Sequence, residues 1–190
     1  MLQQPAIAVG CAFVFGLLIG SFLNVVILRL PARLEWQWRR DSRELLELEE
    51  PDAAPPLGIV VERSLCPKCA HQLGAFDNIP LISFLVLRGR CRFCRAPISW
   101  QYPAVELLTG LAFATCVWHF DPGWQALAAL VFTAILIALA GIDLHTQLLP
   151  DQLTYPLLWL GLLLSTITLF VDPVAALIGA SVGYLSLWSV

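Results

Sequence analysis

The chain is made of long apolar runs and one long polar segment, and the runs have the length of membrane-spanning helices. Nearly uncharged runs cover Ala6 to Leu28, Val105 to Val117 with a start near Pro103, Trp124 to Ile142, Leu153 to Val171 and Pro173 to Val190. A helix needs about 20 apolar residues to cross a bilayer, and its backbone groups must pair internally in lipid. The pattern therefore predicts an all-α polytopic membrane protein with about five transmembrane helices.

The composition agrees with this pattern. Of the 190 residues, 58% are hydrophobic and only 13% are charged, which does not suit a soluble domain. The run Ala6 to Leu28 lacks the basic start of a secretory signal and is too long for one, so we expect a retained helix. The net charge of −3 carries little information, because the positions of the charges matter more than their sum.

Basic residues lie only in the polar segment between the first two runs. All eleven Lys and Arg residues fall between Arg29 and Gln101. Because basic residues close to span ends mark the cytoplasmic side, we expect the loop 29–101 to be cytoplasmic and the N-terminus to be outside. By the same topology the turn 119–123 is outside and the segment 143–152 is cytoplasmic.

The loop divides into a helix, a linker and a compact module. Residues 32–50 are rich in Arg, Glu and Leu and predict a short helix. This helix is either solvated or lies on lipid headgroups with Trp36 and Trp38 as anchors. A proline-rich linker then ends it. We expect a separate module at 64–100.

The module contains two Cys-x-x-Cys pairs separated by 21 residues, namely Cys66, Cys69, Cys91 and Cys94. Four thiolates with this spacing suit a tetrahedral structural zinc in a ribbon-like loop. Gly89 precedes the second pair, where a tight knuckle favours a residue without Cβ. The alternative is redox chemistry, through disulfides or a thiol relay, which a cytoplasmic position disfavours.

Several other residues have simpler explanations. His71 lies within the first knuckle and is an alternative metal ligand. Cys11 and Cys116 fall within apolar runs and are expected to pack there. Gly179 and Gly183 form a small-xxx-small pair, which predicts close helix packing.

Asp143 is the most informative acidic residue, because it ends the uncharged third run. An ionisable group at the edge of the membrane core is a functional candidate, although a carboxylate that has merely reached the interface fits as well. His145 is close enough to tune Asp143, and ordinary interfacial placement explains it equally. Glu106, about one turn into the second run, is either functional or paired with nearby arginines.

Three further aspartates lie beside prolines at turns, where helix capping explains them; they are Asp121, Asp151 and Asp172. The chain has no His-Glu-x-x-His segment and no phosphate-binding glycine loop, so carboxylates are the best catalytic candidates. Peptide hydrolysis by carboxylates needs two, one protonated while the other activates water. Asp143 is the one convincing member of such a pair.

Taken in order along the chain, these residues resemble the type 4 prepilin peptidases, a family of membrane aspartic peptidases and N-methyltransferases. The stretches that carry the resemblance, besides the cysteine pairs, are Gly20–Val26, Arg29–Pro31, Asn78–Leu81, Leu87–Cys91, Tyr102–Glu106 and Ile142–Asp151. The long loop with cysteines is similar to the bifunctional Gram-negative form of the family.

The resemblance implies an enzyme of the bacterial inner membrane. Such enzymes cut the leader from type IV prepilins and type II secretion pseudopilins at the cytoplasmic face. They then methylate the new N-terminus with S-adenosylmethionine. Asp143 matches the first catalytic aspartate, whereas Asp151 matches a Leu-Pro-Asp segment that is not catalytic. The cysteine loop is associated with methyl transfer, but no residue for S-adenosylmethionine is identified. Pilin precursors and lipid are the expected partners, and nucleic acid is not.

One departure from the family pattern changes the expectation. The second catalytic aspartate of the family lies in a Gly-x-Gly-Asp segment downstream of a position like Val190. We therefore expect residues 1–190 to be the N-terminal part of a longer enzyme, with the peptidase domain starting at 103–190, and to be inactive alone. Two alternatives stay open: a non-enzymatic membrane anchor with a zinc-knuckle interaction loop, and a membrane thiol oxidoreductase.

Overall fold

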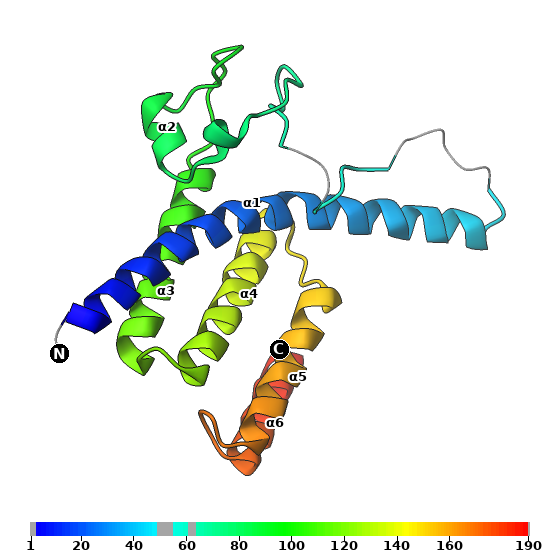
Figure 1. Ribbon diagram of the computed structural model, residues 1–190. Coiled ribbons are helices and arrows are strands. Elements are labelled where there is room, and N and C mark those ends of the chain that lie inside the picture. The colour runs from blue at the N-terminus through cyan, green and yellow to red at the C-terminus, as the bar shows by residue number, and fades with distance from the viewer. Residues whose placement is uncertain (1–2, 49–54, 61–63, 190) are drawn as a thin grey trace.

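The structure is a computed structural model that describes residues 3–48, 55–60 and 64–189. Within these residues every regular element is helical, which confirms the predicted all-α class. The elements are α1 (Gln3–Leu45), the 3-10 helix η1 (Ala75–Asn78), α2 (Ile82–Val86), α3 (Gln101–Phe120), α4 (Trp124–Thr146), α5 (Asp151–Thr166) and α6 (Pro173–Trp188). Figure 1 shows α1 crossing α3 and α4, the polar module above the start of α3, and the α5–α6 pair to one side.

Helix α1 is much longer than the first apolar run. It has 43 residues and continues through Pro31 to Leu45. Proline inside a helix removes one backbone hydrogen bond and bends the helix without always ending it, and α1 changes direction along its length (Figure 1). The helix expected at 32–50 is therefore the second half of α1 and not a separate element.

Glycines bring α1 very close to its neighbours. A Cβ atom at Gly16 would lie 2.8 Å from the Cα of Gly110, and one at Gly20 would lie 2.7 Å from the Cα of Glu106. A Cβ at Gly141 of α4 would lie 2.5 Å from the Cδ1 of Ile27. Small residues at these points let helix backbones approach in the way that membrane helices favour. Larger side chains there would force α1 away from α3 and α4.

The core lies where α1 crosses α4. Ile27 is 1% exposed and Ile142 is fully buried, and they form one cluster with Leu23, Val26 and Ala138. Ile59 of the long loop packs against the same cluster. The loop therefore reaches back to the end of α4 that carries Asp143.

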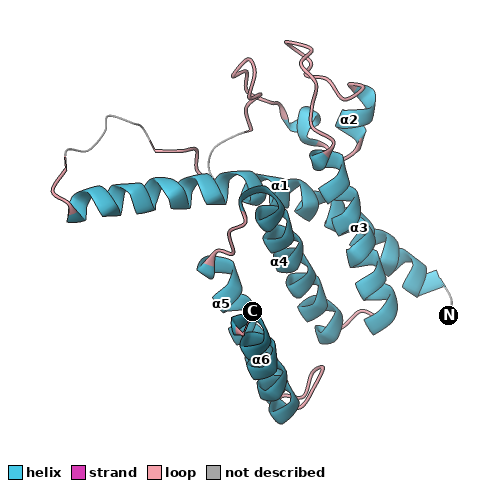
Figure 2. Ribbon diagram, turned by 180° about the vertical axis from the view of Figure 1, so that it is seen from behind, coloured by secondary structure: helices cyan, strands magenta, loops and turns pink. Residues whose placement is uncertain are grey.

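In the part of the chain that the structure describes, three helices are long and apolar enough to cross a membrane: α1, α3 and α4. Helices α5 and α6 have 16 residues each, below that length, so the expected number of five spans is not confirmed. Asp172 caps α6 as predicted, since its Oδ1 accepts hydrogen bonds of 3.0 Å from the backbone of Val174 and Ala175. In both ribbon views α5 and α6 lie beside each other, outside the bundle of α1, α3 and α4 (Figures 1 and 2).

The predicted packing role of Gly179 and Gly183 is wrong within the described chain. A Cβ atom at either glycine would meet nothing within 4 Å. The close packing belongs instead to Gly16 and Gly20, which have the same four-residue spacing. Residues 179–183 also match the Gly-x-Ser-x-Gly spelling of a serine nucleophile, but they lie inside α6 and not on the strand-to-helix turn that such a site requires.

Candidate functional site

The two cysteine pairs lie on two backbone turns that repeat one pattern of hydrogen bonds. In the first turn Cys66 N donates to His71 O (3.0 Å), and Ala70 N donates to Cys66 O (2.9 Å). In the second turn Cys91 N donates to Ala96 O (2.8 Å), and Arg95 N donates to Cys91 O (3.0 Å). Each partner stands at the same offset from its first cysteine. Two short segments therefore make the same knuckle twice.

The knuckles also share their backbone conformation. Ala70 and Arg95, each four residues after the first cysteine of its turn, have φ values of 54° and 57°. Gly89 has a φ of 66°, which confirms that the turn before the second pair favours a residue without Cβ. One isolated bridge closes each turn, Leu65 with Gln72 and Arg90 with Pro97.

The knuckles bring four sulfur atoms together. The Sγ atoms of Cys66, Cys69, Cys91 and Cys94 all lie within 4.8 Å of one another. The Cys66 and Cys94 sulfurs are 3.8 Å apart, and a tetrahedron with Zn–S bonds of about 2.3 Å has edges of about 3.8 Å. Disulfide sulfurs would lie about 2 Å apart. The cluster can hold a metal ion, and its four thiol donors and their separation fit zinc.

The thiols differ in their surroundings. Cys66 and Cys91 are 6% and 5% exposed, whereas Cys69 and Cys94 are exposed. Backbone N–H groups of Cys69 and Lys68 lower the pKa of Cys66 to about 6. The backbone N–H of His71 lowers the pKa of Cys69, but desolvation and the neighbouring sulfurs outweigh it and raise that pKa to about 11. A bound divalent cation would stabilise the thiolate form of all four cysteines, so the neighbouring sulfurs would no longer raise one another's pKa.

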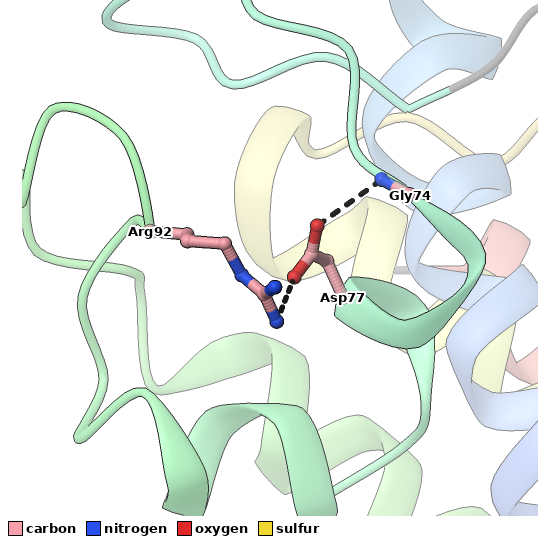
Figure 3. A network of polar contacts seen from close by, with 3 residues as sticks. All are labelled: Gly74, Asp77 and Arg92. Atoms are coloured by element: carbon pink, nitrogen blue, oxygen red, sulfur yellow. Dashed lines mark hydrogen bonds and ion pairs between the residues drawn. The ribbon is translucent and has the colours of Figure 1, made fainter.

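Contacts outside the sulfur cluster join the two knuckles. The rings of His71 and Phe93 lie with centroids 3.5 Å apart, and His71 is not part of the sulfur cluster. Asp77 accepts a hydrogen bond from Gly74 N (3.2 Å) and forms an ion pair with Arg92 (2.8 Å), as Figure 3 shows. The Asp77 side chain is only 8% exposed. No motif predicts a role for Asp77, because nothing in the spacing of one aspartate signals a contact with a distant arginine.

Glu106 connects the module to the membrane helices. It is 7% exposed, and its Oε2 accepts a hydrogen bond of 2.8 Å from Leu81 N. The Ser21 hydroxyl of α1 is a further donor to the same carboxylate. Leu81 has a φ of 58°, which is unusual for a residue with a Cβ. Glu106 therefore holds a strained point of the loop against α3, and an arginine partner is not needed to explain it.

Asn24 lies beside this connection and is 1% exposed. Its Nδ2 donates to Gly20 O (3.2 Å) and to Tyr102 O (3.1 Å), which joins α1 to the first turn of α3. Its Nδ2 is thus paired, whereas its Oδ1 is buried without a hydrogen-bond partner among the described residues. Asn24, from the Gly20–Val26 stretch, is thus a structural residue at the crossing of the two helices.

Asp143 lies in the last turn of α4, exposed, at the end that faces the long loop. Its carbonyl accepts a hydrogen bond of 2.9 Å from Gln147 N, which ends the helix. Among the described residues no hydrogen bond or ion pair joins the Asp143 side chain to another carboxylate. The structure therefore does not pair Asp143 with Glu106 or Asp151.

The remaining candidates have ordinary contacts. His145 Nε2 lies 2.9 Å from Gln101 Oε1, so it links the end of α4 to the start of α3. Asp151 is the first residue of α5 and makes no capping hydrogen bond, and Asp121 follows α3 without capping α4. The capping predictions for these two aspartates are wrong, because Pro150 and Gly123 occupy the cap positions.

The two cysteines within the apolar runs differ from each other. Cys116 packs between helices as predicted, since its Sγ lies 3.5 Å from Thr133 Oγ1 of α4. Cys11 is exposed on α1, so the predicted packing is wrong within the described chain.

Comparison with known proteins gives two family matches. Residues 14–120 match the family described as the bacterial peptidase A24 N-terminal domain, and residues 130–190 match the type IV leader peptidase family. The first match covers more than half of the chain and contains the cysteine module. The second contains Asp143. No solved structure matches.

Curated relatives are similar to the chain over nearly its whole length, and each is named prepilin leader peptidase/N-methyltransferase. The one from Xanthomonas campestris pv. campestris is 55% identical over 188 residues, which is 99% of this chain and 66% of the relative. The one from Stutzerimonas stutzeri is 50% identical over 99% of this chain and 65% of the relative. The one from Neisseria gonorrhoeae is 45% identical over 95% of this chain and 64% of the relative. The chain thus spans about two thirds of the length of these relatives.

Proposed function

The chain belongs to the type IV leader peptidase family, and on this premise we propose that it serves in prepilin processing. In this proposal the enzyme removes the leader peptide of type IV prepilins and type II secretion pseudopilins. It then transfers a methyl group from S-adenosylmethionine to the new N-terminus. The printed names of the relatives support both activities.

In this proposal Asp143 is one member of the aspartate pair that activates water for leader cleavage. The observation that carries the proposal is its position. Asp143 is exposed at the end of α4, directly after the fully buried Ile142, which packs with Ile27 of α1. A rigid helix end that presents a carboxylate to solvent at the membrane edge suits a general base.

The second carboxylate of the pair is, in this proposal, not among residues 1–190. Two carboxylates act together only when they are close enough for one to hold a proton while the other is ionised. Among the described residues, no hydrogen bond joins the Asp143 side chain to a second carboxylate. In this proposal residues 1–190 do not cleave prepilin by themselves, and cleavage by them would contradict this part of it.

The decisive experiment compares Asp143→Asn with Asp151→Asn in an enzyme that cleaves prepilin. Asp143→Asn should slow cleavage by at least about 10²–10⁴-fold, because a general base contributes that much. Asp151→Asn is the matched control, since Asp151 is also an exposed aspartate near the same membrane edge and should be dispensable. Both variants should keep their metal. Normal cleavage by Asp143→Asn would refute the assignment.

We further propose that the four cysteines hold one zinc ion, which shapes the module and takes no part in chemistry. A closed set of four thiolates leaves no open position on the metal for a substrate. The link between the module and methyl transfer is what the family resemblance implies. Metal analysis should give one zinc per chain, and a metal-free protein with paired disulfides would favour the thiol oxidoreductase instead.

The proposed location is the bacterial inner membrane, with the loop 29–101 in the cytoplasm and the N-terminus outside. Two observations support a common side for the loop and Asp143. Ile59 of the loop packs against the cluster that contains Ile142, and His145 contacts Gln101 at the start of α3. Protease accessibility of the loop in inverted and right-side-out membrane vesicles tests the orientation.

A second candidate function is a membrane anchor whose zinc knuckles recruit a cytoplasmic partner. The module favours it, because Phe93 of the second knuckle is 50% exposed. The cleavage experiment separates the two candidates. An anchor would tolerate Asp143→Asn in every assay, whereas a peptidase would not.

A further inference from the structure

The metal module contains a short apolar helix, α2, with one exposed apolar face. In α2 the side chains of Ile82, Leu85 and Val86 are 58%, 72% and 71% exposed. The other side of α2 is partly covered, because Phe84 is half-buried and its ring packs against Trp100 with centroids 4.9 Å apart. Three large apolar side chains on five residues are a costly surface in water.

Two contacts fix the depth of α2 along the membrane helix α3. At its start, Leu81 N donates to Glu106, which lies five positions after Gln101 at the beginning of α3. With a rise of 1.5 Å per residue, that bond is about 7.5 Å inside the start of α3. Further along, Phe84 contacts Trp100, the cap residue of α3. Helix α2 therefore lies beside the first turn of a membrane span.

The surroundings of α2 match the zone between lipid headgroups and acyl chains. Trp100 is 76% exposed at the same level, and aromatic side chains gather at this zone in membrane proteins. Arg88 and Arg90, both exposed, follow α2 directly, and such arginines suit anionic headgroups. In both ribbon views the loop tips of the module lie farther from α3 than α2 does (Figures 1 and 2).

We propose that α2 is a membrane-interface anchor of the metal module. Ile82, Leu85 and Val86 insert into the boundary between headgroups and acyl chains beside α3. Arg88 and Arg90 face the lipid phosphates. Apolar side chains with flanking basic residues bind such a boundary through buried area and charge together. The knuckles are thereby held at a fixed height above the bilayer, independently of any leader peptide or methyl donor.

The test is photolabelling of the whole protein in nanodiscs of anionic phospholipid that carry a diazirine on the acyl chain near the headgroup. Adducts are located by peptic digestion and tandem mass spectrometry. Leu108 of α3, 55% exposed, is the lipid-facing reference, and Phe93 of the knuckles, 50% exposed, is the reference for water. We expect Leu85 and Val86 to be labelled as strongly as Leu108, and Phe93 to stay unlabelled.

A double variant, Leu85→Asp with Val86→Asp, should abolish labelling of residues 82–86 and leave the metal content unchanged. Leu45→Asp is the matched control: it adds charge to an 84% exposed leucine outside the module and should not alter labelling of α2. Unlabelled Leu85 and Val86 in the unaltered protein would overturn the proposal and indicate a protein that covers α2. Labelling of Phe93 equal to that of Leu85 would overturn it as well, because the contact would then be unspecific.

Discussion

The metal module and the Asp143 end of α4 are built in different ways. The module uses contacts within residues 64–100, where two turns of the same pattern bring four sulfurs within 4.8 Å. Asp143 stands at the end of a long helix, exposed, without a carboxylate partner among the described residues. A site made of local turns is complete within one segment. A site made at helix ends depends on which helices are brought together.

The largest expected effect in the module is the loss of metal on replacing a buried cysteine. Cys66→Ser or Cys91→Ser should abolish zinc binding, since structural zinc contributes on the order of 10–16 kcal/mol of binding free energy that depends on its complete ligand set. Metal content measured by plasma mass spectrometry tests this. Cys11→Ser is the control, because Cys11 is an exposed thiol outside the cluster. One full equivalent of zinc in Cys66→Ser would show that the four sulfurs are not the ligand set.

A smaller effect is expected where the module joins α3. Glu106→Ala removes the acceptor of the Leu81 N–H, and a buried donor left unpaired costs about 1–3 kcal/mol. The rate of amide hydrogen exchange in the segment 81–86 should therefore rise by about tenfold for each 1.4 kcal/mol of local stability that is lost. The cysteine knuckles should keep their metal.

Glu106→Gln is the matched variant for this junction, because the amide oxygen still accepts the hydrogen bond from Leu81. It should preserve most of the protection at residues 81–86. Equal exchange rates in Glu106→Ala and the unaltered protein would mean that the module is held to α3 by other contacts.

The smallest effect is expected from the ion pair between Asp77 and Arg92. Arg92 is 52% exposed, so solvent screens the pair, and Asp77→Asn should lower stability by no more than about 1 kcal/mol. Thermal unfolding of the whole zinc-loaded protein tests this. The exposed pair of Glu35 and Arg39 is the comparison, and Glu35→Gln should have no measurable effect. A large loss of metal in Asp77→Asn would show that the pair is essential to the knuckles.

Much of the module and of the membrane helices could be predicted from the sequence. Cysteine spacing predicts a knuckle because two residues between ligands permit only a tight turn, and Gly89 at a φ of 66° agrees with this. Apolar runs predicted α3 and α4 because lipid leaves no alternative to a helix. These are local constraints, and a sequence displays them directly.

Other features depend on what the chain meets in space. The polar residues after Leu28 predicted a separate helix at 32–50, but α1 continues through Pro31 to Leu45. Gly16 and Gly179 have the same four-residue spacing to a second glycine, and only the first pair meets another helix. The spacing shows that one face of a helix is lined by small residues, and it does not show which other helix packs against that face.

The second half of α1 has a consequence for the way the loop can vary in length. Arg29 NH1 donates to Gly58 O, and Arg33 NH1 lies 3.5 Å from Pro56 O. The loop thus returns to α1 and is hydrogen-bonded to it close to the point where α1 leaves the helix bundle. The part of α1 that follows Arg33 therefore extends away from a point at which the chain is held a second time. Insertions or deletions in this part of α1 would alter how far the helix reaches and leave the height and position of the knuckles unchanged.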